Sequence, residues 1–129
     1  DQRPRRYFAI PQPSRSPRSR DWKPFATISF WPERAVRGQV HFRLSRVKRE
    51  GSAVLLKIDG RPFQLMAGGR DAWGPDPRGD AEIISALRGG IEMVVETRSE
   101  RGALVRDHYQ LPGAATAIDA AALACAGPA

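Results

Sequence analysis

The sequence has little of what most catalytic and metal sites are built from. Its 129 residues include one cysteine, Cys125, and two histidines, His41 and His108. One cysteine cannot form a disulfide within the chain, so Cys125 is expected to be unpaired unless another chain supplies a partner. These three side chains are too few for a tetrahedral zinc site. We therefore expect no metal and no cofactor.

Other absences narrow the class of protein further. No apolar run approaches the ~18–20 residues that a membrane-spanning helix needs. No GxxxxGK or GxGxxG loop occurs, and no helix-turn-helix, RNP or zinc-finger pattern indicates specific nucleic-acid recognition. His108 follows Asp107 directly, but neighbours on a strand point to opposite faces, so the two cannot pair locally. The sequence thus favours a protein that is not an enzyme.

Two short patterns carry only weak signals. Asp71, Asp76 and Asp80 fall in one loop region, but their spacing does not fit a calcium-binding EF-hand. Arg78-Gly79-Asp80 matches the integrin-recognition tripeptide, which recurs by chance. We expect Asp80 to serve instead as the N-cap of a helix.

Positive charge is plentiful and unevenly placed. Residues 1–49 hold 13 Lys/Arg against 3 Asp/Glu, and residues 50–129 hold 8 against 11. Such a balance favours an anionic partner: an acidic protein, a polysaccharide or an anionic membrane surface. Arginine predominates in the first half, and its planar fork suits bidentate contacts with phosphate or carboxylate. The candidate partner-binding residues are Arg15, Arg18, Arg20, Arg37, Arg43, Arg46, Lys48 and Arg49.

Period-2 alternation of apolar and polar residues predicts a mainly β fold. The clearest case is 39–46, where Val40, Phe42 and Leu44 alternate with His41, Arg43 and Ser45. Asp59-Gly60 is a strong hairpin signal. The predicted strands are 7–10, 25–31, 39–46, 53–58, 63–66, 91–97 and 103–111. We expect an antiparallel β-sandwich or barrel formed by a single domain over 1–129.

Helices and loops complete the prediction. A short internal helix is expected over 80–88, with Gly89-Gly90 as a left-handed C-terminal stop. The alanine-rich stretch 114–125 predicts a C-terminal helix that needs docking to persist. Residues 11–21, rich in Pro, Arg and Ser, are expected to form a mobile loop. Residues 70–79 are expected to be a second loop.

The ordered landmarks of this chain resemble the invasion-associated locus B (IalB) family of exported alphaproteobacterial proteins. The resemblance covers roughly residues 6–125. It implies a β-sandwich-like domain that is periplasmic or secreted, with no catalytic residues to transfer. It also implies a cysteine in the first strand, which this chain lacks. The matching residues are Ile58-Asp59-Gly60, Phe63, Leu65, Ala72-Trp73, Asp76, Asp80, Ile83, Ala86, Arg88, Gly90, Met93, Val95, Ser99, Arg101-Gly102, Asp107, Tyr109, Leu111, Gly113 and Ala124-Cys125.

Three functional hypotheses follow. The first is a non-enzymatic cell-envelope protein that binds an acidic partner through its basic first half. The second is a structural or assembly subunit that pairs through a sheet edge or through Cys125. The third is a small enzyme with an unrecognised site near His41, Asp107 or His108. The sequence leaves the oligomeric state open.

Overall fold

The structure is a computed structural model of the whole chain, and it describes residues 7–9, 23–31, 37–111 and 114–126. The strands are β1 (Tyr7–Ala9), β2 (Phe25–Trp31), β3 (Arg37–Arg43), β4 (Val54–Ile58), β5 (Arg61–Gly68), β6 (Asp71–Trp73), β7 (Glu92–Arg98) and β8 (Leu104–Gln110). The helices are α1 (Pro77–Gly89) and α2 (Ala114–Ala126). The expected mobile loop at 11–21 falls outside the described residues.

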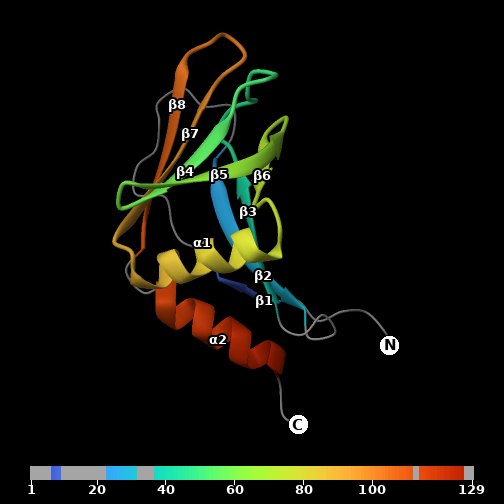
Figure 1. The fold of residues 1–129 in the computed structure, drawn as a ribbon, viewed down its shortest axis with the longest axis vertical. Helices are drawn as coiled ribbons and strands as arrows, with labels where there is room; N and C mark the ends of the chain where they lie inside the picture. The colour runs from blue at the N-terminus through green and yellow to red at the C-terminus, as the bar shows by residue number, and fades with distance from the viewer. Residues whose placement is uncertain (1–6, 10–22, 32–36, 112–113, 127–129) are drawn as a thin grey trace.

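All eight strands belong to one antiparallel sheet, in the order β1-β2-β3-β6-β5-β4-β7-β8. The sheet is curled into a half-barrel, α1 lies across it, and α2 lies beside α1 and against β1 and β2 (Figure 1). The predicted mainly β fold, with one internal helix and one C-terminal helix, is confirmed. The arrangement is a single curled sheet, because β5 joins what would otherwise be two separate sheets.

Strand β5 changes partner halfway along its length. Its first part, Arg61–Leu65, pairs with β4, and its second part, Met66–Gly68, pairs with β6. The β4–β5 hairpin turns at Asp59 and Gly60, whose φ values of 49° and 86° are both positive, as a two-residue hairpin turn requires. The predicted hairpin is therefore confirmed.

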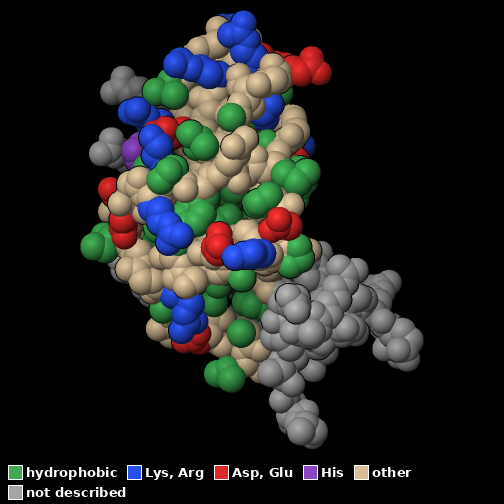
Figure 2. All heavy atoms as spheres, in the orientation of Figure 1, with side chains coloured by type: hydrophobic (Ala, Val, Ile, Leu, Met, Phe, Trp, Pro, Cys, Tyr) green, Lys and Arg blue, Asp and Glu red, His purple; other side chains and the backbone are tan. Residues whose placement is uncertain are grey.

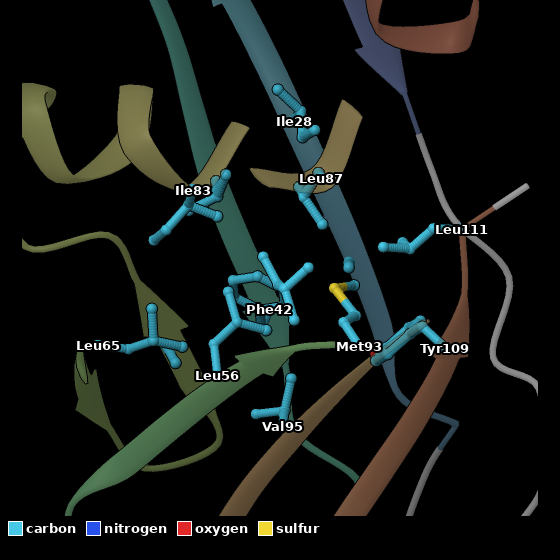
Figure 3. Close-up of a cluster of buried hydrophobic side chains, with 14 of the residues drawn as sticks. Ile28, Phe42, Leu56, Leu65, Ile83, Leu87, Met93, Val95, Tyr109 and Leu111 are labelled. Carbon is cyan, nitrogen blue, oxygen red and sulfur yellow. The ribbon is translucent and has the colours of Figure 1, made fainter. Parts of the chain in front are cut away.

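The hydrophobic core lies inside the curl of the sheet. Side chains from the strands meet Ile83 and Leu87 of α1 there (Figure 3). Val40, Phe42 and Leu44 are each 1% exposed, so the alternation predicted for this strand lines the interior. The remaining buried apolar side chains on the strands are Ala26, Ile28, Phe30, Val54, Leu56, Ile58, Leu65, Ala72, Met93, Val95, Val105 and Tyr109.

Two positions break the predicted alternation. Ile91 opens the predicted strand 91–97, where alternation would place it inward with Met93, but it precedes β7 and is 72% exposed. Its carbonyl still accepts a hydrogen bond of 2.9 Å from Leu111 N–H. Ser45 was expected to face solvent beside Arg43, but it is 1% exposed. Strand β3 ends at Arg43, and the chain beyond it no longer keeps the alternation of the strand.

Helix α1 begins earlier than predicted. Its N-cap is Asp76, whose side chain accepts a hydrogen bond of 2.6 Å from Gly79 N–H, and Pro77 occupies the first helical turn. Asp80, the predicted cap, lies within that first turn and is 6% exposed. The predicted left-handed stop is also wrong, because Gly90 is extended, with a φ of −87°.

Strand β6 was not predicted at all. Its three residues lie inside the expected loop 70–79 and pair with β3 on one side and β5 on the other. Helix α2 matches the predicted C-terminal helix, and its Ile118 side chain is buried. Arg88 of α1 donates a hydrogen bond to Asp119 of α2, which links the two helices.

Candidate functional site

Cationic side chains gather at the end of the half-barrel where three connections meet. These are the β3–β4 loop (44–53), the β5–β6 turn (69–70) and the β7–β8 hairpin (99–103). Figure 2 shows Lys and Arg side chains over this upper end of the molecule. The six cations in or next to these connections, together called the basic end, are Arg46, Lys48, Arg49, Arg70, Arg98 and Arg101.

Backbone hydrogen bonds hold the three connections together. Lys48 N–H donates to Gly69 at 2.8 Å, and Arg49 N–H donates to Arg98 at 2.8 Å. Lys48 also forms an isolated bridge with Ser99. The cations of the basic end are therefore brought together by the fold, although they come from distant parts of the sequence.

A hollow of about 250 Å³ opens between the β3–β4 loop and the β7–β8 hairpin. It is lined by Arg46, Val47, Ser99, Glu100 and Arg101. Arg46 stands on one side of the hollow, and Arg101 stands on the other beside the carboxylate of Glu100. Arginine on both sides offers donors that match the oxygens of carboxylate, sulfate or phosphate.

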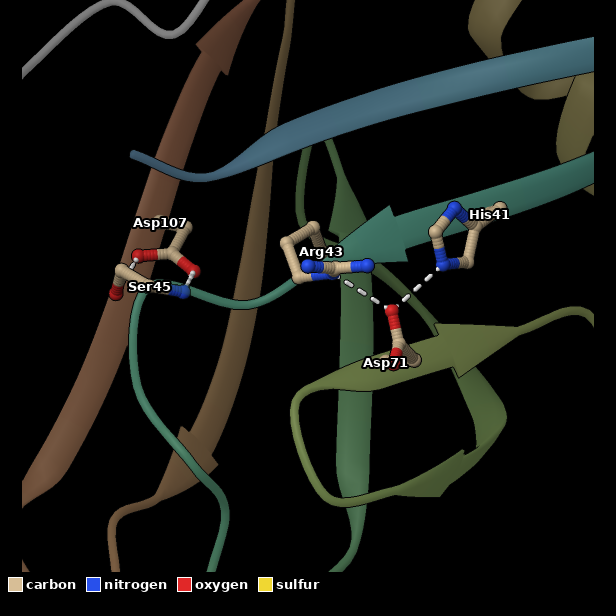
Figure 4. Close-up of polar contacts among 5 residues, drawn as sticks. All are labelled: His41, Arg43, Ser45, Asp71 and Asp107. Carbon is tan, nitrogen blue, oxygen red and sulfur yellow. Dashed lines mark hydrogen bonds and ion pairs between the residues drawn. The ribbon is translucent and has the colours of Figure 1, made fainter. Parts of the chain in front are cut away.

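The β3–β4 loop is anchored at its start by a buried carboxylate. Asp107 of β8 is 1% exposed and accepts hydrogen bonds from Ser45 N–H at 3.0 Å and from Ser45 Oγ at 2.5 Å (Figure 4). Asp107 falls on the apolar face of its strand, and these hydrogen bonds satisfy its buried carboxylate. Burial raises the pKa of neighbouring Tyr109, and the charge of Asp107 adds to this rise.

A second polar cluster lies on the outer face of the sheet, opposite the core. Asp71 Oδ1 accepts a hydrogen bond of 2.8 Å from Arg43 Nε and lies 2.8 Å from His41 Nε2 (Figure 4). Partial burial alone would raise the pKa of Asp71, but the hydrogen bonds from His41 and Arg43 outweigh it and hold this pKa below its usual value. The carboxylate thus orients the His41 ring and the Arg43 guanidinium.

Large apolar side chains flank this cluster. Phe25 is 36% exposed, Trp73 is 45% exposed and Met66 is 58% exposed. The His41 ring lies 5.9 Å from the Phe25 ring and 5.8 Å from the Trp73 ring, measured between centroids. The guanidinium of Arg43 lies 5.5 Å from the centroid of Phe25. These six side chains, together called the outer strip, are Phe25, His41, Arg43, Met66, Asp71 and Trp73.

The structure divides the predicted partner-binding residues. Arg46, Lys48 and Arg49 belong to the basic end, and Arg43 belongs to the outer strip. Arg15, Arg18 and Arg20 lie outside the described residues, and Arg37 begins β3 with a side chain that is likewise not described. Where the described residues allow a comparison, the predicted set separates into two neighbouring surfaces.

Sequence reasoning missed half of the basic end. Arg70, Arg98 and Arg101 come from the second half of the chain, where acidic residues outnumber basic ones. The sequence shows only that each of these arginines lies beside a predicted turn or strand end. Strand pairing places those turns next to the β3–β4 loop, and pairing across such distances cannot be read from composition.

The side chains considered for catalysis are bonded to non-catalytic partners or face away from one another. Asp107 is occupied by Ser45, and His108 alternates to the other face of β8, half-buried. Asp80 of the integrin-type triplet is buried and accepts a hydrogen bond of 3.2 Å from Val40 N–H. No group of His, Cys, Asp and Glu within the described ranges is placed to hold a metal ion. Among the same residues, no helix has the length and apolar character to cross a membrane.

Comparison of the chain with family models, with curated proteins and with solved structures finds no match. Membership of the IalB family, export and the acidic partner therefore stay predictions.

Proposed function

We propose that this chain is a non-enzymatic, exported binding protein, similar to IalB proteins, that holds an acidic partner at its basic end. The observation that carries the proposal is the convergence of six cations in or next to three connections that themselves hold two carboxylates, Glu50 and Glu100. The backbone hydrogen bonds between the connections support a preformed surface. Such a surface loses less conformational entropy on binding than a flexible surface would.

The electrostatics of the basic end suit a polyvalent anion. Exposed charges attract an anion over about 8 Å at physiological salt. Cations gathered on one end act together within that range, whereas scattered cations do not. A single anionic group could seat in the hollow between Arg46 and Arg101, and a polymer could also reach Arg49, Arg70 and Arg98.

The experiment compares two triple variants of equal net charge. The test variant, Lys48→Gln/Arg49→Gln/Arg101→Gln, removes three cations from the basic end. The control variant, Arg61→Gln/Arg78→Gln/Arg106→Gln, removes three exposed cations from elsewhere. Both are loaded on an anionic resin carrying sulfated polysaccharide at ~0.15 M salt, where surface charges are screened as in a cell.

The test variant should elute at clearly lower salt than the wild type, and the control should elute close to it. A third variant, Glu50→Gln/Glu100→Gln, removes the carboxylates of the same loops and should elute at higher salt. Equal weakening of the test and control variants would refute the proposal, because retention would then follow net charge rather than the basic end.

A second candidate function rests on the edge of the sheet. Among the described strands, β8 ends the sheet order and pairs with β7 alone. An unpaired edge can add a strand from another copy of the chain, which fits the assembly-subunit hypothesis. Light scattering with and without reductant tests this: a mass of one chain in both conditions excludes pairing through the edge and through Cys125.

A further inference from the structure

The outer strip exposes three large apolar side chains around a charged centre. Phe25, Met66 and Trp73 stand on the outer face, whereas neighbouring positions of the same strands point into the core. Strand register explains the arrangement. His41 pairs with Trp73, and Trp73 pairs with Met66, so these three side chains form one row across β3, β6 and β5.

The next row along the strands carries the charges. Phe25 pairs with Arg43, and Arg43 pairs with Asp71. Neighbouring strands lie about 4.8 Å apart, so the strip spans about 14 Å from β2 to β5. The 14 Å is the extent of the strip across the strands, and its two rows lie two residues, about 7 Å, apart along them.

We propose that the outer strip stacks the sugar rings of an acidic polysaccharide whose charged groups bind the basic end. This inference rests on the proposed function and names its partner. Sugars present a C–H face, which packs on aromatic rings, and hydroxyl groups, which both donate and accept hydrogen bonds. The strip offers the matching groups: the Trp73 and Phe25 rings, the Asp71 carboxylate as acceptor, and the Arg43 guanidinium as donor.

The strip borders the basic end along the backbone. Asp71 follows Arg70 of the basic end directly in the chain. Arg43 precedes Leu44, whose N–H donates a hydrogen bond of 2.7 Å to the carbonyl of Arg70. A polymer bound at the basic end therefore passes over the Arg43–Asp71 row before it reaches Trp73.

The charges within the strip favour a sugar over other polyanions. A bilayer would have to bury Arg43, His41 and Asp71 together with the aromatic rings, and desolvating these polar groups is costly. A phosphate backbone would meet the carboxylate of Asp71 and offers no donor to it. A uronic acid also carries a carboxylate on each ring, but its hydroxyl groups can donate to Asp71. The combination of stacking rings with an acceptor fits a polysaccharide best.

The experiment measures the affinity of the full chain for four probes by calorimetry at ~0.15 M salt. The probes are a galacturonic acid hexamer, inorganic polyphosphate of similar charge, a thymidine hexanucleotide and vesicles rich in anionic lipid. Trp73→Ala removes the largest ring of the strip. Leu104→Ala is the matched control, because Leu104 is 48% exposed and lies outside the strip.

The wild type should bind the uronic acid hexamer more tightly than polyphosphate. Trp73→Ala should weaken the hexamer about 10-fold, in keeping with the energy of an aromatic contact, and leave polyphosphate unchanged. Unchanged polyphosphate binding also shows that this variant is folded. Leu104→Ala should change neither affinity.

The possible failures separate the two proposals. If no probe binds the wild type, the proposed function fails, and this inference fails with it. If hexamer and polyphosphate bind equally and Trp73→Ala alters neither, the strip has no role, while the basic end stands. If Trp73→Ala weakens the oligonucleotide or the vesicles as much as the hexamer, a polysaccharide is the wrong partner.

Discussion

The hydrogen bonds between Asp107 and Ser45 connect β8 to the start of the β3–β4 loop, and their removal has a predictable cost. Each hydrogen bond to a charged group contributes about 1.5–3 kcal/mol. Part of this gain is offset because the wild type pays to desolvate a carboxylate that is 1% exposed. For Asp107→Ala we therefore expect a loss of about 2–4 kcal/mol in the free energy of unfolding.

Two further variants separate the contributions. Ser45→Ala removes the hydroxyl and leaves the backbone N–H bonded to Asp107, so it should cost about 1–2 kcal/mol. Asp107→Asn keeps one acceptor for Ser45 N–H, and its amide can donate to Ser45 Oγ. It loses the charge but neither contact, so we expect it to destabilise less than Asp107→Ala does.

Urea denaturation followed by tryptophan fluorescence measures these differences. With a slope of about 2 kcal/mol per M, a loss of 3 kcal/mol moves the midpoint down by about 1.5 M. The double variant Ser45→Ala/Asp107→Ala should lose less than the sum of the single losses, because the two residues share their contacts. A midpoint for Asp107→Ala within about 0.3 M of the wild type, or strictly additive losses, would refute the assigned hydrogen bonds.

Three more perturbations test the packing and charges around α1 and the outer strip. A Cβ at Gly74 would overlap the Asp80 carboxylate, so Gly74→Ala should cost about 1–3 kcal/mol in urea denaturation, whereas Gly89→Ala, with open space around it, should not. Burial raises the folded-state pKa of Asp80 above its ordinary value of 3.8, so the wild type loses stability as the pH rises from 3.8 through the raised pKa. The stability of Asp80→Asn relative to wild type should therefore increase between pH values below 3.8 and neutrality. A stability difference that does not change with pH would contradict this. Asp71 has the opposite shift, a folded-state pKa held below 3.8 by hydrogen bonds that outweigh its burial; Asp71→Asn should cost at most about 1 kcal/mol near neutral pH, and the cost should vanish on acidification below pH 3.8.

The parts of the fold that follow from local pattern could be predicted from the sequence. Val40, Phe42 and Leu44 face the core because alternation on a strand sorts side chains between two faces, and this information lies within a few residues. The turn at Asp59-Gly60 is equally local. Ser45 shows where such reasoning ends: it continues the pattern in sequence, but its environment is decided by Asp107, which lies 62 positions away.

The errors around α1 have a different origin. Two aspartates four positions apart can each cap a helix, and the N-cap was predicted at Asp80 rather than at Asp76. Pro77 was the local signal that favours the earlier start, since proline suits the first turn of a helix. What places Asp80 inside the helix is its hydrogen bond to Val40 of β3, a tertiary contact. Strand β6 was missed for a related reason, because three residues beside Gly and Pro become a strand only through their partners β3 and β5.

Only half of the cations of the basic end could be predicted, because charge was summed over segments of the sequence rather than over regions of the folded surface. The second half of the sequence is acidic overall, yet most of its described carboxylates have local roles away from the basic end. Glu96 pairs with Lys57 and Arg106 on the outer face, at 3.2 and 3.1 Å. Asp119 pairs with Arg88 between the helices, and Asp76 caps α1.

The carboxylates placed in the three connections of the basic end are Glu50 and Glu100. Because exposed charges act over about 8 Å at physiological salt, an anion approaching this end responds mainly to the charges gathered there. Asp71, beside Arg70, and Asp107, bonded to Ser45 beside Arg46, also border this end, whereas carboxylates elsewhere, such as Glu96 and Asp119, contribute little. The acidic balance of the second half therefore does not cancel the basic end. Three arginines of that same half, Arg70, Arg98 and Arg101, strengthen it instead, since the strand order β6-β5-β4-β7-β8 returns their turns to the β3–β4 loop. The charge that an anion meets is therefore the sum over the end of the sheet, and this sum cannot be obtained from either half of the sequence alone.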